Sequence, residues 1–158
     1  MGKEIEHKYI VTGKEFIDMA TESHNIKQGY LCKDKERTIR IRIMDTTAFV
    51  TIKGETHGDT RAEYEYPLPL DDAMSMMDSL CINPIIEKTR YIVPFKGNNW
   101  EVDMFKGFLD GLILAEIEIP SSEYKYDIPP FVGKNVTNDA RYYNSNLVNG
   151  NIPDVDNH

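Results

Sequence analysis

Charged side chains recur at alternate positions in most of the chain's short apolar segments, beginning with Glu4, Glu6 and Lys8. Guanidinium and ammonium groups bind phosphate oxygens, and carboxylates hold hard divalent cations such as magnesium. The alternating set comprises eight acids and seven bases, namely Glu4, Glu6, Glu63, Glu65, Glu101, Asp103, Glu116 and Glu118 with Lys8, Arg40, Arg42, Lys53, Arg61, Lys88 and Arg90. Acids for a metal and bases for a polyanion together indicate a phosphoryl-transfer site.

The alternation predicts β-strands, because successive side chains of a strand point to opposite faces. Isoleucine, valine, tyrosine, tryptophan and methionine occupy the positions between the charges. Short turns at Asp45-Thr46 and Gly97-Asn98-Asn99 have hairpin chemistry and favour antiparallel neighbours. The expected strands are 4–11, 26–32, 37–44, 47–54, 60–68, 85–95, 100–105 and 112–119.

Three helices accompany these strands in the sequence pattern. Residues 15–24 and about 139–147 read as short helices, and Ala73, Met76, Met77 and Leu80 recur at helical spacing after Asp71. The predicted fold is therefore α+β, an eight-stranded antiparallel β-barrel with helices packed outside. Residues 1–150 are expected to form a single domain, and residues 151–158 a polar C-terminal tail.

The charged face could point to water or into the barrel. For a single strand, such as the one that carries Glu63 and Glu65, the solvent-facing arrangement is the default. The whole set favours the interior, because its charges nearly balance while the chain carries a net charge of -8. The apolar face needs the helices as cover, and buried charges need partners or ligands. We therefore expect a polar tunnel that binds a charged small molecule.

Composition excludes several other classes of protein. An acidic surface disfavours nucleic acids and acidic membranes, and no apolar run suits a signal peptide or a membrane-spanning helix. The expected location is cytoplasmic, with Cys32 and Cys81 as reduced, partly buried thiols. The sequence leaves open whether the protein is a monomer or a homodimer.

The Glu4-x-Glu6-x-Lys8 motif resembles the N-terminal signature of the CYTH domain superfamily, the triphosphate tunnel metalloenzymes. The similarity covers nearly the whole chain, and its C-terminal part resembles that of short bacterial tripolyphosphatases. It continues in family order through Arg40-x-Arg42, Thr51-x-Lys53, Glu63-x-Glu65, Lys88-x-Arg90, Glu101-x-Asp103, Glu116-x-Glu118 and Asp139-x-Arg141-Tyr142-Tyr143-Asn144.

The resemblance implies a role for each charged position and a requirement for Mg²⁺ or Mn²⁺. Metal binding falls to Glu4, Glu6, Glu116, Glu118, Glu101 and Asp103. Substrate binding falls to Lys8, Arg40, Arg42, Lys53, Arg61, Lys88 and Arg90. Catalytic roles fall to Glu63, Glu65, Lys8 and Asp103. Tyr30 fits either the tunnel rim or the core.

The activity implied by the resemblance is metal-dependent hydrolysis of a triphosphate, with inorganic triphosphate as the first choice and pyrophosphate and phosphate as products. Shared motifs leave several family activities open. These alternatives are a class IV adenylate cyclase, a thiamine, nucleoside or RNA 5′-triphosphatase, and a non-catalytic triphosphate-binding protein.

Overall fold

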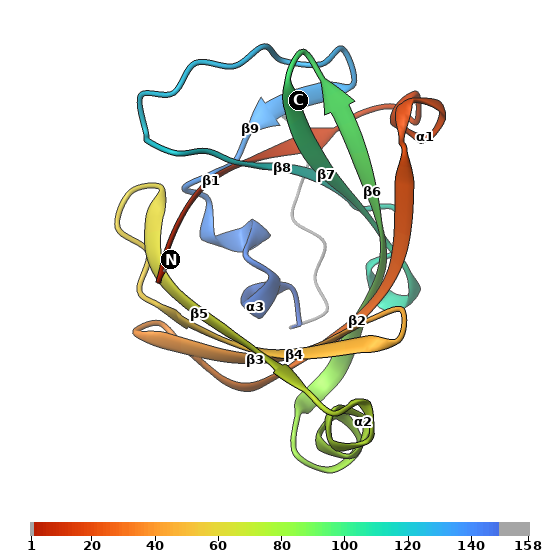
Figure 1. The fold of residues 1–158 in the computed structure, drawn as a ribbon, viewed down its shortest axis with the longest axis vertical. Coiled ribbons are helices and arrows are strands. Elements are labelled where there is room, and N and C mark those ends of the chain that lie inside the picture. Colours follow the sequence, from red (N-terminus) through yellow and green to blue (C-terminus); the bar gives the residue numbers. More distant parts are fainter. Residues whose placement is uncertain (1, 149–158) are drawn as a thin grey trace.

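A computed structural model describes residues 2–148 of the chain, and within them an antiparallel sheet closes into a barrel (Figure 1). The strand order is β5-β4-β3-β2-β6-β7-β8-β1, and a further pairing of β1 with β5 closes the ring. The eight barrel strands are β1 (Lys3–Val11), β2 (Glu22–Asp34), β3 (Arg37–Met44), β4 (Thr47–Gly54), β5 (Thr60–Leu68), β6 (Ile82–Phe95), β7 (Asn98–Phe105) and β8 (Ile113–Glu118). The predicted eight-stranded antiparallel barrel is confirmed.

One edge of β1 is shared between two partners. Residues 3–5 pair with β5, whereas Tyr9 and Val11 pair with β9 (Val132–Asn135). The four residues of β9 include a glycine and carry no alternating pattern, so β9 is not among the expected strands. The backbone of β1 between these pairings is satisfied by loops, since the Glu6 N–H donates to the carbonyl of Asp59 at 3.2 Å and the Lys8 N–H to Oγ1 of Thr137 at 3.0 Å.

Several predicted boundaries change because sheet pairing overrides local preference; β6, for example, begins at Ile82 and not at residue 85. Helix α1 spans only Phe16–Met19, and Glu22, Ser23 and His24 belong to β2 instead of the predicted helix at 15–24. These three residues pair with β6, which keeps their backbone groups bonded. At the β6–β7 turn, Lys96 and Gly97 take positive φ values of 45° and 86°, so the turn lies before Asn98 and Asn99.

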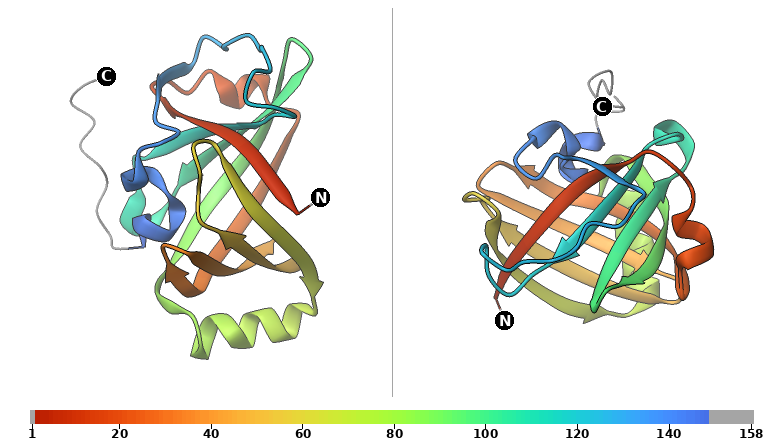
Figure 2. Two further views of the ribbon diagram at one scale, coloured as in Figure 1. Left: turned by 90° about the vertical axis from the view of Figure 1, so that its left-hand side faces the viewer. Right: turned by 90° about the horizontal axis from the view of Figure 1, so that it is seen from above.

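The longest helix covers the outer face of the barrel. Figure 2 shows helix α2 (Leu70–Ser79) outside the barrel. Its fully buried Ala73 belongs to one apolar cluster with Ile41 of β3 and Ala48 of β4. Helix α1 likewise buries Phe16, whose ring lies 5.4 Å from that of Tyr91. For these two helices the predicted packing outside the barrel is confirmed.

The C-terminal segment does not pack outside the barrel, as its predicted helix was expected to do. The expected helix at about 139–147 is divided in two, the 3₁₀ turn η2 (Ala140–Tyr142) and helix α3 (Asn144–Leu147). Tyr143 lies between them with an extended backbone, at ψ 132°. The first 3₁₀ turn, η1 (Gly107–Leu109), links β7 to β8. Figures 1 and 2 show that the segment lies across one end of the barrel and not against its outer wall.

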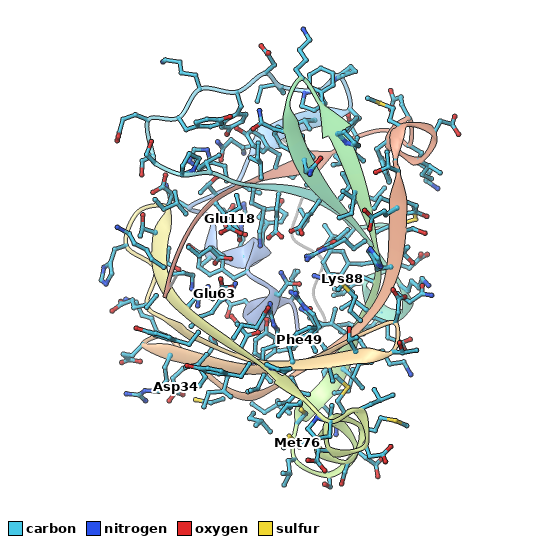
Figure 3. All side chains as sticks on the ribbon, viewed as in Figure 1. Asp34, Phe49, Glu63, Met76, Lys88 and Glu118 are labelled. Carbon is cyan, nitrogen blue, oxygen red and sulfur yellow. The ribbon has the colours of Figure 1, made fainter. Side chains whose placement is uncertain are left out.

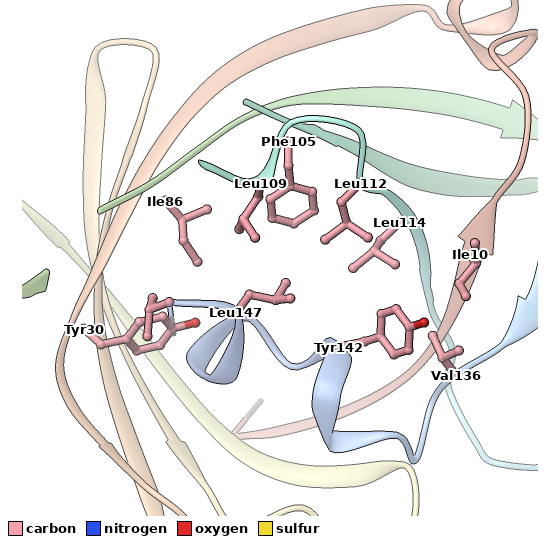
Figure 4. Close-up of a cluster of buried hydrophobic side chains, with 11 residues drawn as sticks. Ile10, Tyr30, Ile86, Phe105, Leu109, Leu112, Leu114, Val136, Tyr142 and Leu147 are labelled. Atoms are coloured by element: carbon pink, nitrogen blue, oxygen red, sulfur yellow. The ribbon is translucent and has the colours of Figure 1, made fainter. Parts of the chain in front are cut away.

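That end of the barrel is filled by apolar side chains (Figure 4). On β1 and β8 the inner face changes from charged to apolar two residues beyond a charge: Ile10 follows Lys8, and Leu114 precedes Glu116. The cluster joins the barrel to the C-terminal segment and comprises Ile10, Tyr30, Ile86, Phe105, Leu109, Leu112, Leu114, Val136, Tyr142, Leu147 and Val148. We call this the closed end.

Three further expectations concern the chain as a whole. Cys32 and Cys81 are free and half-buried. No helix within residues 2–148 combines the length and the apolar character that crossing a membrane requires. The domain limits of 1–150 remain a prediction, and the predicted tail at 151–158 lies outside the described residues.

Candidate active site

A polar cavity of about 250 Å³ occupies the barrel interior. Figure 3 shows Glu63, Glu118 and Lys88 on its inner side, whereas Asp34 and Met76 lie outside the barrel. Of the charged residues singled out in the sequence, all but Asp103 line the cavity, namely Glu4, Glu6, Lys8, Arg40, Arg42, Lys53, Arg61, Glu63, Glu65, Lys88, Arg90, Glu101, Glu116 and Glu118. The alternating charges therefore meet in one place, because strand parity directs them inward.

Three arginines give β3 and β5 a positively charged wall. The Nε atoms of Arg40, Arg42 and Arg61 are buried and have no hydrogen-bond partner among the described residues. Burial, with Arg40 and Arg90 nearby, lowers the pKa of Arg42 to about 9. Buried donors without acceptors are costly, so this wall suits an anion that brings many oxygen acceptors.

A second wall, from the neighbouring strands β1 and β8, concentrates carboxylates and adjoins the first where β1 pairs with β5. Burial first, and then the neighbouring Glu116 and Glu4, raise the pKa of Glu6 well above its ordinary value. Burial and nearby carboxylates also raise the pKa of Glu118, which lies opposite Glu6 in the β1–β8 pairing. Neither Glu6 nor Glu118 forms an ion pair with another residue of the described chain. Crowded carboxylates of this kind are stabilised by a cation.

The carboxylates of the cavity fit a hard divalent cation, as the resemblance to the CYTH superfamily implies. Carboxylate oxygens are the ligands that magnesium and manganese prefer. Within residues 2–148 no three Asp, Glu, His or Cys side chains converge as a ready coordination sphere. Glu4 is held by Lys53, with Nζ 3.0 Å from Oε1, and Glu116 by Lys8, with Nζ 3.2 Å from Oε2. Glu63, Glu65 and Glu101 are paired with Lys53, Arg40 and Arg90. Among the strand carboxylates of the described cavity, Glu6 and Glu118 are therefore those that neither a lysine nor an arginine engages.

Asp103 lies behind the cavity surface, where it holds two cations. Its oxygens are 2.7 Å from Nζ of Lys88, 2.8 Å from Nε of Arg90 and 2.9 Å from Nη2 of Arg90. Burial would raise the pKa of Asp103, but Arg90 and Lys88 hold it far below its ordinary range. This geometry supports a role in fixing Lys88 and Arg90. Its assignment to metal binding and catalysis stays a prediction.

The cavity also contains residues that the sequence analysis did not assign. Thr38 shares the strand parity of Arg40 and Arg42, so alternation could have identified it. Tyr30 both lines the cavity and joins the closed-end cluster, so each of the two predicted positions is partly correct. The others come from loops or the C-terminal segment, which carry no periodic signal: Thr56, Gly58, Asp59, Thr137, Tyr143, Asn144 and Ser145.

The fold and this charged interior are those of a known class. The CYTH domain model matches residues 2–147, and the chain belongs to the CYTH domain family. It is 43% identical over 148 residues to an inorganic triphosphatase of Acetivibrio thermocellus, with 94% of each chain covered. It is 34% identical to an inorganic triphosphatase of Nitrosomonas europaea, with 91% of this chain and 95% of the relative covered.

Solved structures give the same architecture. A crystal structure described as an inorganic triphosphatase superposes with a TM-score of 0.68 at 32% identity, and the match covers 96% of this chain and 97% of that one. A putative adenylate cyclase from Bacillus halodurans superposes with a TM-score of 0.61 at 17% identity, over 78% of this chain and 84% of that one. The second similarity shows the fold alone.

Proposed function

We propose that the protein is a metal-dependent inorganic triphosphatase, which cleaves triphosphate to pyrophosphate and phosphate. The observation that carries this proposal is the pairing of two unlike walls in one cavity. Arg40, Arg42 and Arg61 present buried Nε donors that have no partner among the described residues. Glu6 and Glu118 line the same cavity with carboxylates that form no ion pair there. The names of the relatives from Acetivibrio and Nitrosomonas support the same activity.

In this proposal the basic residues bind and orient the substrate. Guanidinium groups grip phosphate oxygens with two donors, and Lys8, Lys53, Lys88 and Arg90 add charge around the chain of phosphates. Glu6 and Glu118, with Glu4 and Glu116, would hold Mg²⁺ or Mn²⁺. When bound, the cation supplies charge neutralisation to the phosphoryl oxygens.

Hydrolysis then needs positioning more than covalent chemistry. Water attacks the phosphorus in line with the leaving oxygen, and no side chain has to be phosphorylated. Glu63 and Glu65 border the cavity from β5, where they are placed to orient that water. Burial and the nearby Glu4 raise the pKa of Glu63, which suits a group that accepts a proton.

The test is release of phosphate and pyrophosphate from inorganic triphosphate, ATP and thiamine triphosphate, each with magnesium or manganese. We expect turnover of inorganic triphosphate above the other two, and complete loss after chelation with EDTA that excess metal restores. Cyclic AMP and pyrophosphate formed from ATP would assign a cyclase instead. Tight triphosphate binding without any product would assign a binding protein, and both results would contradict the proposal.

Replacing Arg42 by methionine tests the positive wall. Loss of charge-assisted hydrogen bonds is expected to raise the KM for triphosphate about 10- to 100-fold, with a smaller effect on kcat. Arg37→Met is the matched control, because Arg37 lies on the same strand with a 62% exposed side chain beside Asp34. An unchanged KM in Arg42→Met would remove Arg42 from substrate binding.

A further inference from the structure

Asn144 belongs to a C-terminal motif for which the proposed chemistry has so far given no use. The extended backbone at Tyr143 separates the 3₁₀ turn η2 from α3, and residues 143–145 consequently border the cavity. Tyr143, Asn144 and Ser145 therefore reach the substrate cavity from its closed end, although they lie outside the barrel strands.

The side chain of Asn144 accepts two hydrogen bonds at one oxygen. Oδ1 lies 3.2 Å from Nζ of Lys88 and 3.1 Å from Nε2 of Gln28. A lysine ammonium only donates, so the atom that faces it must be the amide oxygen of Asn144. Gln28 is fully buried, and its amide N–H holds that oxygen in place. The Asn144 acceptor is therefore fixed in direction.

The Lys88 ammonium has few other partners. It is 1% exposed, with Nζ 2.7 Å from Asp103 and 5.2 Å from the ring centroid of Phe105. An ammonium carries three N–H donors, of which Asp103 and Asn144 each accept one. Lys88 nevertheless lines the cavity, so its third donor is available to a bound phosphate.

A second buried lysine is held by the same segment. Nζ of Lys8 donates to the carbonyl of Tyr142 at 3.1 Å and pairs with Glu116 at 3.2 Å. The C-terminal segment thus offers one neutral oxygen to each lysine and leaves the negative charge to the barrel. Neutral acceptors orient an ammonium without cancelling the charge that attracts a phosphate.

We propose that Asn144 is a positioning residue for triphosphate hydrolysis, which fixes the Lys88 ammonium at the closed end so that its third N–H points to a phosphate of the substrate. This role rests on the proposed function. It acts through Lys88 alone, and it makes the C-terminal segment part of the active site as well as the cover of the barrel end.

A double-mutant cycle tests the proposal. We expect Asn144→Leu to lower kcat/KM for inorganic triphosphate about 10-fold, within the range of one charge-assisted hydrogen bond. Lys88→Met should lower it further, and the double variant should be no worse than Lys88→Met. Asn144→Asp keeps the acceptor oxygens, so it should retain kcat while its added charge raises KM. Thermal melts establish that each variant is folded.

Asn146→Ala is the matched control from the same short helix. Asn146 is exposed and donates to the carbonyl of Ala140 at 2.7 Å, so its loss loosens the segment without touching either lysine. We expect turnover close to that of the wild type. A loss in Asn146→Ala equal to that in Asn144→Leu would overturn the proposal, because loosening alone would then explain both.

Additive losses at Asn144 and Lys88 would also overturn it. Inactivity of the wild type would instead contradict the proposed function and not this inference. In that event the double-mutant cycle of Asn144 and Lys88 is repeated with the Kd for inorganic triphosphate as the measured quantity. Non-additive weakening of binding would support the link between Asn144 and Lys88, and additive weakening would reject it.

Discussion

Replacing Glu6 by glutamine is expected to lower triphosphate hydrolysis about 100- to 1,000-fold while leaving the metal-free protein at least as stable as the wild type. Activity falls because Glu6 and Glu118 are the strand carboxylates of the described cavity that neither a lysine nor an arginine engages, and they would hold the cation. Stability is kept because the ionised Glu6 is unfavourable in the fold, where burial and the nearby Glu116 and Glu4 raise its pKa.

The sign of the stability effect follows from proton linkage. A carboxyl whose pKa is higher in the folded protein than in the unfolded chain destabilises the fold once pH exceeds the unfolded value, near 4. At neutral pH a glutamine removes that penalty. Thermal melts should show a melting temperature that rises with magnesium in the wild type, and one that starts no lower but does not respond in Glu6→Gln.

Glu87→Gln is the matched control for Glu6→Gln. Glu87 precedes Lys88 on β6 and is exposed on the outer face, so the same chemical change should alter neither turnover nor the response to magnesium. Full activity in Glu6→Gln, or an undiminished magnesium response, would take Glu6 out of the metal site. A large drop in its melting temperature would contradict the electrostatic account of the carboxylate wall.

Replacing Asp103 by alanine is expected to lower the free energy of unfolding by about 3–5 kcal/mol. Asp103 is 2% exposed and its carboxylate holds both Lys88 and Arg90, so its removal takes from two buried cations the carboxylate that they share. Urea denaturation measures the loss, with Asp110→Ala at an exposed turn position as control. A change below about 1 kcal/mol would mean that Asp103 is not the anchor of these cations.

Acid should weaken the same ion pairs. Burial would raise the pKa of Glu116, but Lys8 and Arg90 lower it to about 2, and the pKa of Asp103 lies far below its ordinary range. Carboxyls with depressed pKa values stabilise the fold fully above the unfolded value near 4, and the contribution is lost as pH falls through their folded values. The stability of Asp103→Ala should therefore depend less on pH below 4 than that of the wild type.

Much of the barrel could be predicted from the sequence, because alternation along a strand decides which face of the sheet each side chain occupies. A period of two puts Arg40 and Arg42 on one face of β3, and a nearly balanced set of charges indicated that this face turns inward. The bounds of β3, β4 and β5 match the predicted ones for the same reason, since hairpin turns and alternation are local properties. The CYTH resemblance rested on these same positions.

The tertiary structure alone decided how the barrel ends and which charges pair. Sheet pairing with β6 extended β2 to Glu22 and shortened α1, and β9 formed because β1 had an open edge. The C-terminal segment packs across the end of the barrel because it buries the apolar side chains there, which include Ile10 and Leu114. This packing places Asn144 beside Lys88. These contacts join residues far apart in the chain, and their energies depend on burial and distance, which no local pattern of residues encodes.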